Sequence, residues 1–495
     1  MSLINITNLT FGYDGSYDNI FEDVSFQLDT AWKLGFTGRN GRGKTTFMKL
    51  LRGIYPYQGT ISASVDFEYF PFEVEDKSIN TIDIAYEKCP DLEYWELAKE
   101  LNMLEVDDEV LYRPFESLSN GEQTKVLLCI LFLKPNAFLL IDEPTNHLDM
   151  NAREAVARYL NKKSGFILIS HDRAVLDNCI DHILSINRTG IEVQKGNFSS
   201  WQENKRRQDN FELAENERLK ADIKHLSQAA KRTSDWSSKV EVSKKGTRNS
   251  GLRPDRGYIG HKAAKMMARS KAIEERREKA MMDKSALLKN IESADNLKIT
   301  PLKYHSSQLL YLDNVSIAYD GKTICENVSF SVDSGDRVLL SGKNGCGKSS
   351  ILKLICGEDI SHCGNIHVGS NLKISVLPQN AEFLAGNLSD YAYENNIDES
   401  LFKAILRKLD FSRVQFEKNM ENFSSGQKKK VLIAKSLCEQ AHLYVWDEAL
   451  NFIDIMSRIQ IESLLTEFKP TMIFVEHDKT FADTTANKIV NIVKN

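Results

Sequence analysis

The chain has 495 residues, of which 42% are hydrophobic and 27% charged, with a net charge of −5. This length suits two or three domains that each bury a core. The sequence has no apolar run of the ~18–20 residues that a membrane-spanning helix needs, no basic and apolar N-terminal stretch typical of a signal peptide, and eight cysteines without CxxC spacing. We therefore expect a cytoplasmic protein with reduced thiols, and the sequence suggests no membrane span, disulfide framework or zinc site.

Four short motifs occur twice, in the same order and at nearly the same offset. The glycine-rich segment 38–45 recurs as 342–349, 304 residues later. The other pairs are Ser119-Asn-Gly121 with Ser424-Ser-Gly426, Asp142-Glu143 with Asp447-Glu448, and His171-Asp172 with His477-Asp478. Such a repeat indicates two copies of one domain, which we place at residues 1–204 and 306–495.

Strands and helices are expected to alternate within each copy. In the first copy the expected elements are a strand at 3–9, a strand at 34–37, the glycine-rich loop, a helix at 46–52, and apolar strands at 137–141 and 165–170. The matching segments of the second copy are 309–315, 338–341, 350–356, 443–446 and 471–476. Continuous apolar runs suit parallel strands that are covered on both faces. Each copy is therefore predicted to be an α/β domain with a largely parallel sheet.

Residues 205–305 differ from both copies in composition. Helix-forming residues with periodic apolar positions predict two long helices, 205–231 and 263–288. Between them, glycine and proline should break any helix; these residues are Gly246, Gly251, Pro254, Gly257 and Gly260. The segment is therefore predicted to be a long antiparallel α-helical hairpin that links the two domains, with an irregular tip at 236–262.

This linker is basic, whereas the rest of the chain is acidic. Residues 202–290 carry 23 Lys and Arg against 13 Asp and Glu, and the excess is greatest over 239–271, with ten against two. Clustered cations beside aromatic and apolar side chains suit contact with RNA, and a solvated charged coiled coil is the alternative. The candidate contact residues at the tip are Trp236, Lys244, Lys245, Arg248, Leu252, Arg253, Arg256, Tyr258 and Ile259.

The glycine-rich loops match the pattern GxxxxGK[ST] between a strand and a helix, which is the P-loop. Its glycines let backbone N–H groups converge on phosphate oxygens at a helix N-terminus. Lys44 and Lys348 are expected to contact the β- and γ-phosphates of ATP, and Thr45 and Ser349 to place a hydroxyl on Mg²⁺. The remaining candidate ATP-binding residues of the loops are Gly38, Asn40, Gly41, Gly43, Thr46, Gly342, Asn344, Gly345, Gly347 and Ser350.

Acid pairs and histidines follow the apolar strands in both copies. The first acid of each pair is expected on the Mg²⁺ side, and the second is expected to polarise an attacking water. Each histidine follows a later strand and is expected to contact the γ-phosphate or that water. Solvated acids and a structural histidine at strand ends are the alternatives. The candidates are Asp142 and Asp447 for Mg²⁺, and Glu143, Glu448, His171 and His477 for catalysis.

Two segments near the first acid pair are more specific. Leu118-Ser-Asn-Gly-Glu-Gln123 and Leu140-Ile-Asp-Glu-Pro-Thr-Asn-His-Leu-Asp149 resemble the signature and the Walker B and D-loop motifs of ATP-binding-cassette ATPases. The resemblance implies that the two domains pair within one monomer and sandwich two ATP molecules, each between one copy's P-loop and the other copy's signature. The implied signature residues are Ser424 and Gly426 for site one, which has the first P-loop, and Ser119 and Gly121 for site two, which has the second.

Other family positions are matched unevenly. Tyr13 and Tyr319 match the adenine-stacking aromatics, and each could equally be a strand-end tyrosine. Gln379 matches the Q-loop glutamine, a further Mg²⁺ candidate, whereas Phe72 stands at that position in the first copy. Ala449 replaces the proline of the family pattern, and the second signature lacks the glutamate of the first. Because the P-loop lysines and catalytic-position glutamates are present, we expect ATP to bind at both sites and hydrolysis to be possible.

Two such domains fused through a charged helical linker resemble the ABC-F family of translation factors. The match covers nearly the whole chain, and the segments 32–44, 201–216, 260–271 and 444–454 resemble the antibiotic-resistance members of the Lsa/Vga type. Residues 73–117 are interpreted as a short insertion in the first domain.

The resemblance implies a ribosome-associated ATPase with ATP and Mg²⁺ as cofactors. It would enter the tRNA exit site of the bacterial 70S ribosome, contact 23S rRNA and P-site tRNA through the linker, and displace lincosamides, streptogramin A and pleuromutilins from the peptidyl-transferase centre. Neither a membrane nor DNA is implied as a partner. The alternatives are a housekeeping ABC-F factor that rescues stalled ribosomes and the ATPase subunit of a drug exporter.

Overall fold

The computed structural model describes residues 2–13, 19–146, 148–187, 190–242, 256–287, 297–319 and 322–492. The chain divides into two compact units. The first comprises Met1–Ile186, Gly190–Ser199 and Ala294–Asn495, and the second comprises Asn187–Thr189 and Ser200–Ser293. The first unit thus contains both copies of the repeated domain, called here the first and second repeats, and the second unit contains the linker helices.

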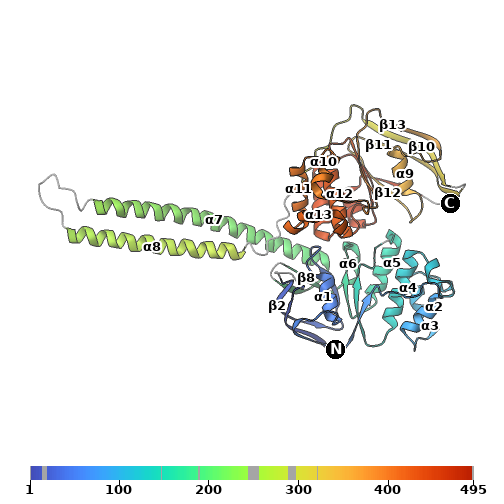
Figure 1. The fold of residues 1–495 in the computed structure, drawn as a ribbon, viewed down its shortest axis with the longest axis horizontal. Coiled ribbons are helices and arrows are strands. Elements are labelled where there is room, and N and C mark those ends of the chain that lie inside the picture. Colours follow the sequence, from blue (N-terminus) through green and yellow to red (C-terminus); the bar gives the residue numbers. More distant parts are fainter. Residues whose placement is uncertain are drawn as a thin grey trace. The chain divides into compact units, whose positions relative to one another are not determined.

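The first repeat has two sheets (Figure 1). One is six-stranded, in the order β5-β6-β7-β3-β8-β9, with parallel pairing except between β8 and β9. The other is three-stranded and antiparallel, in the order β2-β1-β4. The strands are β1 (Leu3–Phe11), β2 (Phe21–Asp29), β3 (Lys33–Thr37), β4 (Gln58–Ser62), β5 (Asp66–Phe70), β6 (Ala137–Asp142), β7 (Phe166–Ile169), β8 (His182–Ile186) and β9 (Ile191–Lys195).

The second repeat has the same plan. Its parallel sheet has the order β14-β15-β16-β12-β17, and its antiparallel sheet the order β11-β10-β13. The strands are β10 (Gln308–Tyr319), β11 (Lys322–Asp333), β12 (Arg337–Ser341), β13 (His362–Val368), β14 (Ile374–Leu377), β15 (Leu443–Asp447), β16 (Met472–Val475) and β17 (Lys488–Asn491). The predicted fold class, two α/β ATPase-type domains, is therefore confirmed, whereas the separate antiparallel sheets were not expected.

The helices of the two repeats also correspond in order. Those of the first repeat are α1 (Lys44–Leu51), α2 (Thr81–Lys88), α3 (Tyr94–Met103), α4 (Asn120–Leu133), α5 (Met150–Asn161) and α6 (Arg173–Cys179). Those of the second are α9 (Lys348–Ile355), α10 (Leu388–Glu394), α11 (Glu399–Lys408), α12 (Ser425–Cys438), α13 (Ile455–Phe468) and α14 (Lys479–Thr485). Because α2 and α3 match α10 and α11, the segment 73–117 is a helical part common to both repeats rather than an insertion in one.

Each parallel sheet is buried on both faces, as its continuous apolar strands require. Successive side chains of β12 point to opposite faces, so that Leu339 belongs to the core on the helical side, whereas Val338 and Leu340 belong to the core shared with the antiparallel sheet and α9. This arrangement leaves the carboxyl ends of the parallel strands as the edge where polar groups gather.

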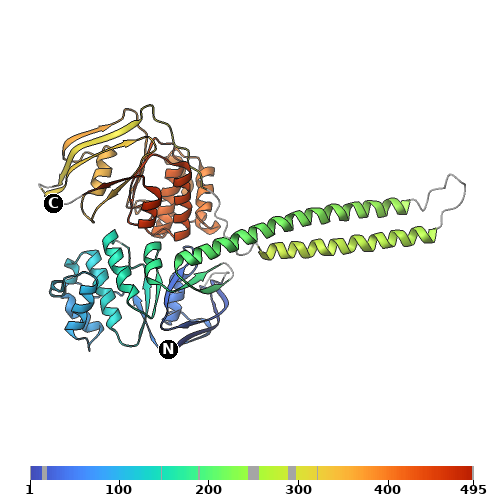
Figure 2. The same cartoon turned by 180° about the vertical axis from the view of Figure 1, so that it is seen from behind.

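The linker unit consists of two long helices, α7 (Phe198–Val242) and α8 (Arg256–Leu287), which run side by side in opposite directions (Figures 1 and 2). Among the helices of the described ranges, including these two, none is long and apolar enough to cross a membrane. The predicted hairpin is present, but its helices are longer than expected.

The predicted tip, 236–262, was placed too widely. Trp236 lies in α7, and the glycines at 257 and 260 lie within α8 instead of breaking it. A helical glycine costs only about 1 kcal/mol relative to alanine, which the helix-forming neighbours of these two residues offset. The helix begins at Arg256, two residues after Pro254. The predicted contact residues Lys244, Lys245, Arg248, Leu252 and Arg253 lie outside the described residues.

Residues 297–302 pack on the second repeat although the sequence analysis assigned them to the linker. Leu297 and Ile299 are buried in the helical-side core of that repeat. The backbone N–H of Leu302 donates to the carbonyl oxygen of Ala441 at 2.8 Å. The polypeptide is therefore attached to the second repeat before its first strand begins.

Replacing Leu297 by alanine is expected to destabilise the second repeat by about 2–5 kcal/mol, because the substitution leaves a cavity in a packed core. Leu213→Ala in α7 is the matched control, since Leu213 is 44% exposed. Urea unfolding followed by hydrogen exchange of second-repeat amides measures the effect. Equal stabilities of the two variants would show that residue 297 does not belong to this core.

Two candidate nucleotide-binding sites

Each P-loop joins a parallel strand to a helix through glycines that adopt left-handed backbone conformations. In the first repeat Gly41 and Gly43 have φ values of 82° and 93°, and in the second Gly345 and Gly347 have 74° and 94°. A Cβ atom on Gly43 would lie 2.5 Å from a methyl carbon of Ile20. Both the backbone conformation and the available space therefore require glycine there, and the loop can wrap its N–H groups around an anion.

The P-loop lysines are buried and point back over their own loops. Lys44 Nζ donates to the carbonyl oxygens of Gly38 and Arg39 at 2.6 and 3.0 Å, and Lys348 Nζ donates to those of Gly342 and Lys343 at 2.9 Å each. Burial lowers the pKa of Lys44, while Asp454 of the second repeat acts in the opposite direction. The ammonium groups therefore stand inside the concave face of each loop, where phosphate oxygens would compete with the carbonyls.

The first acid of each pair lies beside the hydroxyl that follows the P-loop lysine. Thr45 Oγ1 donates to Asp142 Oδ2 at 3.1 Å, and Ser349 bonds to Asp447 in the same way. Asp447 Oδ1 is buried and has no hydrogen-bond partner among the described residues. A hydroxyl beside a partly unsatisfied carboxylate fits Mg²⁺, which binds proteins through few oxygen ligands and completes its shell with water and phosphate.

Mg²⁺ would not be held by side chains alone. In the part of the chain that the structure describes, no group of three or more His, Cys, Asp and Glu residues is arranged to hold a metal ion. The ion would therefore depend on nucleotide phosphates for its remaining ligands, and would supply charge neutralisation at those phosphates. ATP and Mg²⁺ are thus expected to bind together.

The second acid of each pair occupies a turn with an unusual backbone. Glu143 and Glu448 have φ values of 50° and 46°, a left-handed conformation that non-glycine residues rarely adopt. Their backbone N–H groups donate to Ile169 and Val475 at 2.9 and 3.0 Å, which ties the turn to the neighbouring strand. The turn directs the glutamate side chain toward the histidine that follows that strand.

The glutamate and histidine lie close together in both repeats. His171 Nε2 is 3.3 Å from Glu143 Oε1, and His477 Nε2 is 3.6 Å from Glu448 Oε1. Burial lowers the pKa of His171 well below its usual value, so its ring is neutral at pH 7. A neutral ring can donate one hydrogen bond and accept another, which suits a group that orients water beside a carboxylate.

The two glutamates differ in protonation. Burial, and then the charge of Asp142, raise the pKa of Glu143 to about 8. Burial also acts on Glu448, but the neighbouring His477 and Gln379 side chains outweigh it and lower its pKa to about 2. Phe72 offers no such amide in the first repeat, which contributes to the difference.

Each signature begins a helix with the same cap. Ser119 precedes α4, and its side-chain oxygen accepts from the N–H of Glu122 while the Glu122 carboxylate accepts from the N–H of Ser119. Ser424 and Gln427 form the matching pair before α12. The second signature therefore lacks a glutamate without losing its cap, because a glutamine side chain makes the same reciprocal bonds.

Most of the residues predicted for site two, but not Asp447 and Gly342, line one cavity of about 820 Å³. The second repeat contributes its P-loop, with Gln379, Glu448 and His477, and the first repeat contributes its signature. The predicted residues on this cavity are Ser119, Gly121, Tyr319, Asn344, Gly345, Gly347, Lys348, Ser349, Ser350, Gln379, Glu448 and His477. Site two is thus assembled from both repeats.

At site one the two repeats touch directly. Asn40 Nδ2 in the first P-loop donates to the carbonyl oxygen of Phe452 at 3.0 Å. A Cβ atom on the signature Gly426 would lie 2.4 Å from that oxygen and 3.1 Å from Asn40 Nδ2. Arg39 of the same loop forms an ion pair with Asp410 at 3.3 Å. The first P-loop and the second signature are therefore adjacent, as predicted by the family pattern.

Tyr13 and Tyr319 occupy equivalent places beside the two loops. The Tyr13 hydroxyl lies 2.9 Å from Thr46 Oγ1, and the Tyr319 hydroxyl donates to Ser350 Oγ at 3.3 Å. Their side chains are 43% and 44% exposed. Each ring is thus held at its hydroxyl end and remains partly exposed, which suits stacking with a base.

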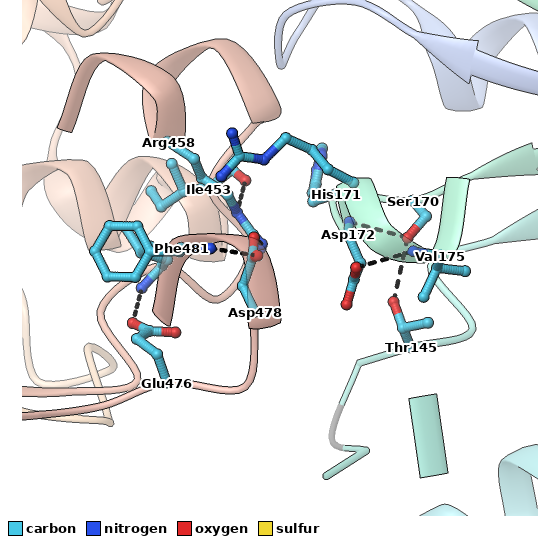
Figure 3. Close-up of polar contacts among 12 residues, drawn as sticks. Thr145, Ser170, His171, Asp172, Val175, Ile453, Arg458, Glu476, Asp478 and Phe481 are labelled. Atoms are coloured by element: carbon cyan, nitrogen blue, oxygen red, sulfur yellow. Dashed lines mark hydrogen bonds and ion pairs between the residues drawn. The ribbon is translucent and has the colours of Figure 1, made fainter. Parts of the chain in front are cut away.

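Two arginines that the sequence analysis did not select connect loops at the two sites. Arg458 donates through Nε to the carbonyl oxygen of Ile453 and through Nη1 to Asp478, at 2.9 and 3.0 Å (Figure 3). Arg153 makes the same pair of bonds to Leu148 and Asp172 at 3.0 and 3.1 Å. Each arginine ties the loop after the acid pair to the residue that follows the histidine. Their equal offset in the two copies could have identified them.

The chain is similar in sequence to known proteins over nearly its whole length. The family model described as ABC transporter matches residues 21–146 and 325–451. The chain is 27% identical to ATP-binding protein Uup of Buchnera aphidicola, over 100% of this chain and 81% of that protein. It is 26% identical to ribosome protection protein VmlR of Bacillus subtilis, over 100% and 87%. It is 25% identical to energy-dependent translational throttle protein EttA of Haemophilus influenzae, over 96% and 89%.

A solved structure supports the fold. The archaeal ribosome recycling factor aABCE1, in complex with a ribosomal stalk protein, has a TM-score of 0.62 over 99% of this chain and 88% of that chain. Its sequence identity of 17% shows likeness of fold alone.

The two sites are expected to respond differently to pH. In a Lys348→Ala chain, hydrolysis should depend on Glu143 and rise as the pH passes through about 8, because the carboxyl must lose its proton to act as a base. In a Lys44→Ala chain it should depend on Glu448, which is already ionised, and stay nearly constant between pH 6 and 9. Steady-state phosphate release measures both profiles, and superimposable profiles would contradict the assignment.

Proposed function

We propose that this chain, which belongs to the ABC transporter family, is an ATP-hydrolysing translation factor of the ABC-F type that binds the bacterial ribosome. The observation that carries the proposal is the pair of P-loop sites, each with an acid pair and a histidine, in a chain that also contains a long basic helical hairpin. ATP would bind between the repeats with Mg²⁺, and Glu143 and Glu448 would activate water with His171 and His477.

Contact with the ribosome is supported by charge and by similarity. Lysine and arginine exceed acidic residues by ten over 202–290, and a run of cations of this kind suits binding to an RNA backbone. Trp236 and Tyr258 are 64% and 66% exposed on the linker helices, and exposed aromatic side chains suit stacking with RNA bases. Two of the similar proteins are named for ribosome protection and for control of translation.

More specifically, we propose that the factor enters the tRNA exit site in the cytoplasm and places the linker near the peptidyl-transferase centre, beside 23S rRNA and P-site tRNA. Its tip would displace lincosamides, streptogramin A and pleuromutilins, and hydrolysis would release the factor. The name of the VmlR relative, a ribosome protection protein, favours this version. The similarity to EttA favours a housekeeping factor without drug specificity equally well. The description of the matching family keeps an exporter subunit as the alternative of another class.

A Glu143→Gln/Glu448→Gln double variant is expected to stay bound to ribosomes in the presence of ATP, because nucleotide binding is kept while the bases are lost. Sedimentation through a sucrose cushion measures the bound fraction. A Lys44→Ala/Lys348→Ala variant is the matched control and should remain in the supernatant, because the phosphate contacts are lost. If the glutamine variant also remains there, the ribosome proposal fails and the exporter alternative gains support.

Expression of the wild-type chain in a drug-sensitive bacterium is expected to raise the inhibitory concentrations of lincosamides, streptogramin A and pleuromutilins. The Glu143→Gln/Glu448→Gln chain should give no protection, because it cannot leave the ribosome. Broth-dilution susceptibility tests measure the effect. Unchanged values for all three drug classes, with ribosome binding intact, would leave the housekeeping factor as the function.

A further inference from the structure

The metal side of site one differs from that of site two at the Q-loop position. In the second repeat Gln379 and Glu448 line the same cavity, and the Gln379 side chain helps to lower the pKa of Glu448. In the first repeat the equivalent residue, Phe72, has its ring 5.0 Å from the ammonium of Lys88 and carries no group that could donate to a carboxylate. Site one therefore needs another source of polar contact if its acids are to be held as firmly.

A tyrosine three residues earlier reaches the Mg²⁺-side acid instead. The hydroxyl of Tyr69 donates to Asp142 Oδ2 at 2.9 Å, and Thr45 Oγ1 donates to the same oxygen at 3.1 Å. Parallel pairing of β5 with β6 sets this contact, because Tyr69 lies opposite Leu140, two residues before Asp142. The strand register therefore places the Tyr69 hydroxyl beside Asp142, at the carboxyl end of β6.

The ring of Tyr69 is itself held in place. The guanidinium of Arg52, just after α1, stands over the ring at 5.2 Å from its centroid. Tyr69, which lies in the edge strand β5, therefore contacts both Arg52 after the P-loop helix and the acid Asp142. In the second repeat, strand β14 has Val376 at the matching register position, opposite Val445, where no hydroxyl is available.

We propose that Tyr69 is a positioning residue for Mg²⁺ at site one, acting through Asp142. The proposal rests on the proposed ATPase function of that site. Two donors on one carboxylate oxygen fix the plane of the carboxylate and leave Oδ1 to face the ion or one of its waters. Groups that hold a metal-side acid in this way commonly change metal affinity by about 10- to 100-fold when removed. Site one would then bind Mg²⁺ with an acid held by two hydroxyl groups, whereas Ser349 is the hydroxyl beside Asp447 in site two.

The test uses the full chain with Lys348→Ala, so that nucleotide binding reports site one. Binding of a fluorescent ATP analogue is followed as Mg²⁺ is titrated, and again in EDTA. Tyr69→Phe should raise the Mg²⁺ midpoint about tenfold and leave binding in EDTA unchanged. Tyr94→Phe is the matched control, because its hydroxyl also donates to an aspartate, Asp108, at 2.9 Å in the same repeat. An unchanged midpoint in Tyr69→Phe overturns the proposal.

A double-mutant cycle shows whether Tyr69 acts through the acid. Because the two side chains are in contact, the effect of Tyr69→Phe should vanish in an Asp142→Asn background. Equal effects in both backgrounds would mean that the tyrosine acts by general packing, which also overturns the proposal. If the Lys348→Ala parent shows no Mg²⁺-dependent binding at all, the ATPase proposal for site one fails first, and the inference about Tyr69 fails with it.

Discussion

Carboxylates buried at the carboxyl ends of parallel strands are the constraint on which both sites depend. Removing Asp142, Glu143 and Asp447 from water raises the pKa of each carboxyl group, because burial penalises the charged form. The chain offsets this cost with hydroxyl and ammonium groups from the P-loop and with contacts from the opposite repeat. A cation bound beside these acids would offset the same penalty, so that cation binding and the stability of the folded site are expected to be linked.

The two sites meet this constraint in unequal ways. In the second repeat, Lys429 donates to the carbonyl oxygens of Pro378 and Glu448, which supports the turn where Ala449 replaces proline. Glu448 is held ionised, whereas Glu143 retains its proton near neutral pH. The difference arises from side chains at matched positions on one backbone plan, so duplication has conserved the geometry while the protonation states have diverged.

Much of this arrangement follows from local sequence. The P-loops, the acid pairs and the signature caps were predictable because their chemistry is set by spacing within a few residues, and the α/β class followed from continuous apolar strands. Tyr69 was not predictable, because its role depends on the register of a neighbouring strand. Arg153 and Arg458 were missed although they share one offset, because their role depends on contacts with Asp172 and Asp478, which lie about 20 residues further along the chain. Gly257 and Gly260 were wrongly expected to end a helix, because single glycines are tolerated within a long run of helix-forming residues.

Helix α7 has one further consequence. It runs for 45 residues as a single uninterrupted element, and an α-helix turns about 100° per residue. Insertion or deletion of one residue within it would turn every side chain beyond that point to another face, while a change of seven or eleven residues would nearly restore the original faces. Phase, and not only length, would therefore limit how a linker of this construction varies among related chains.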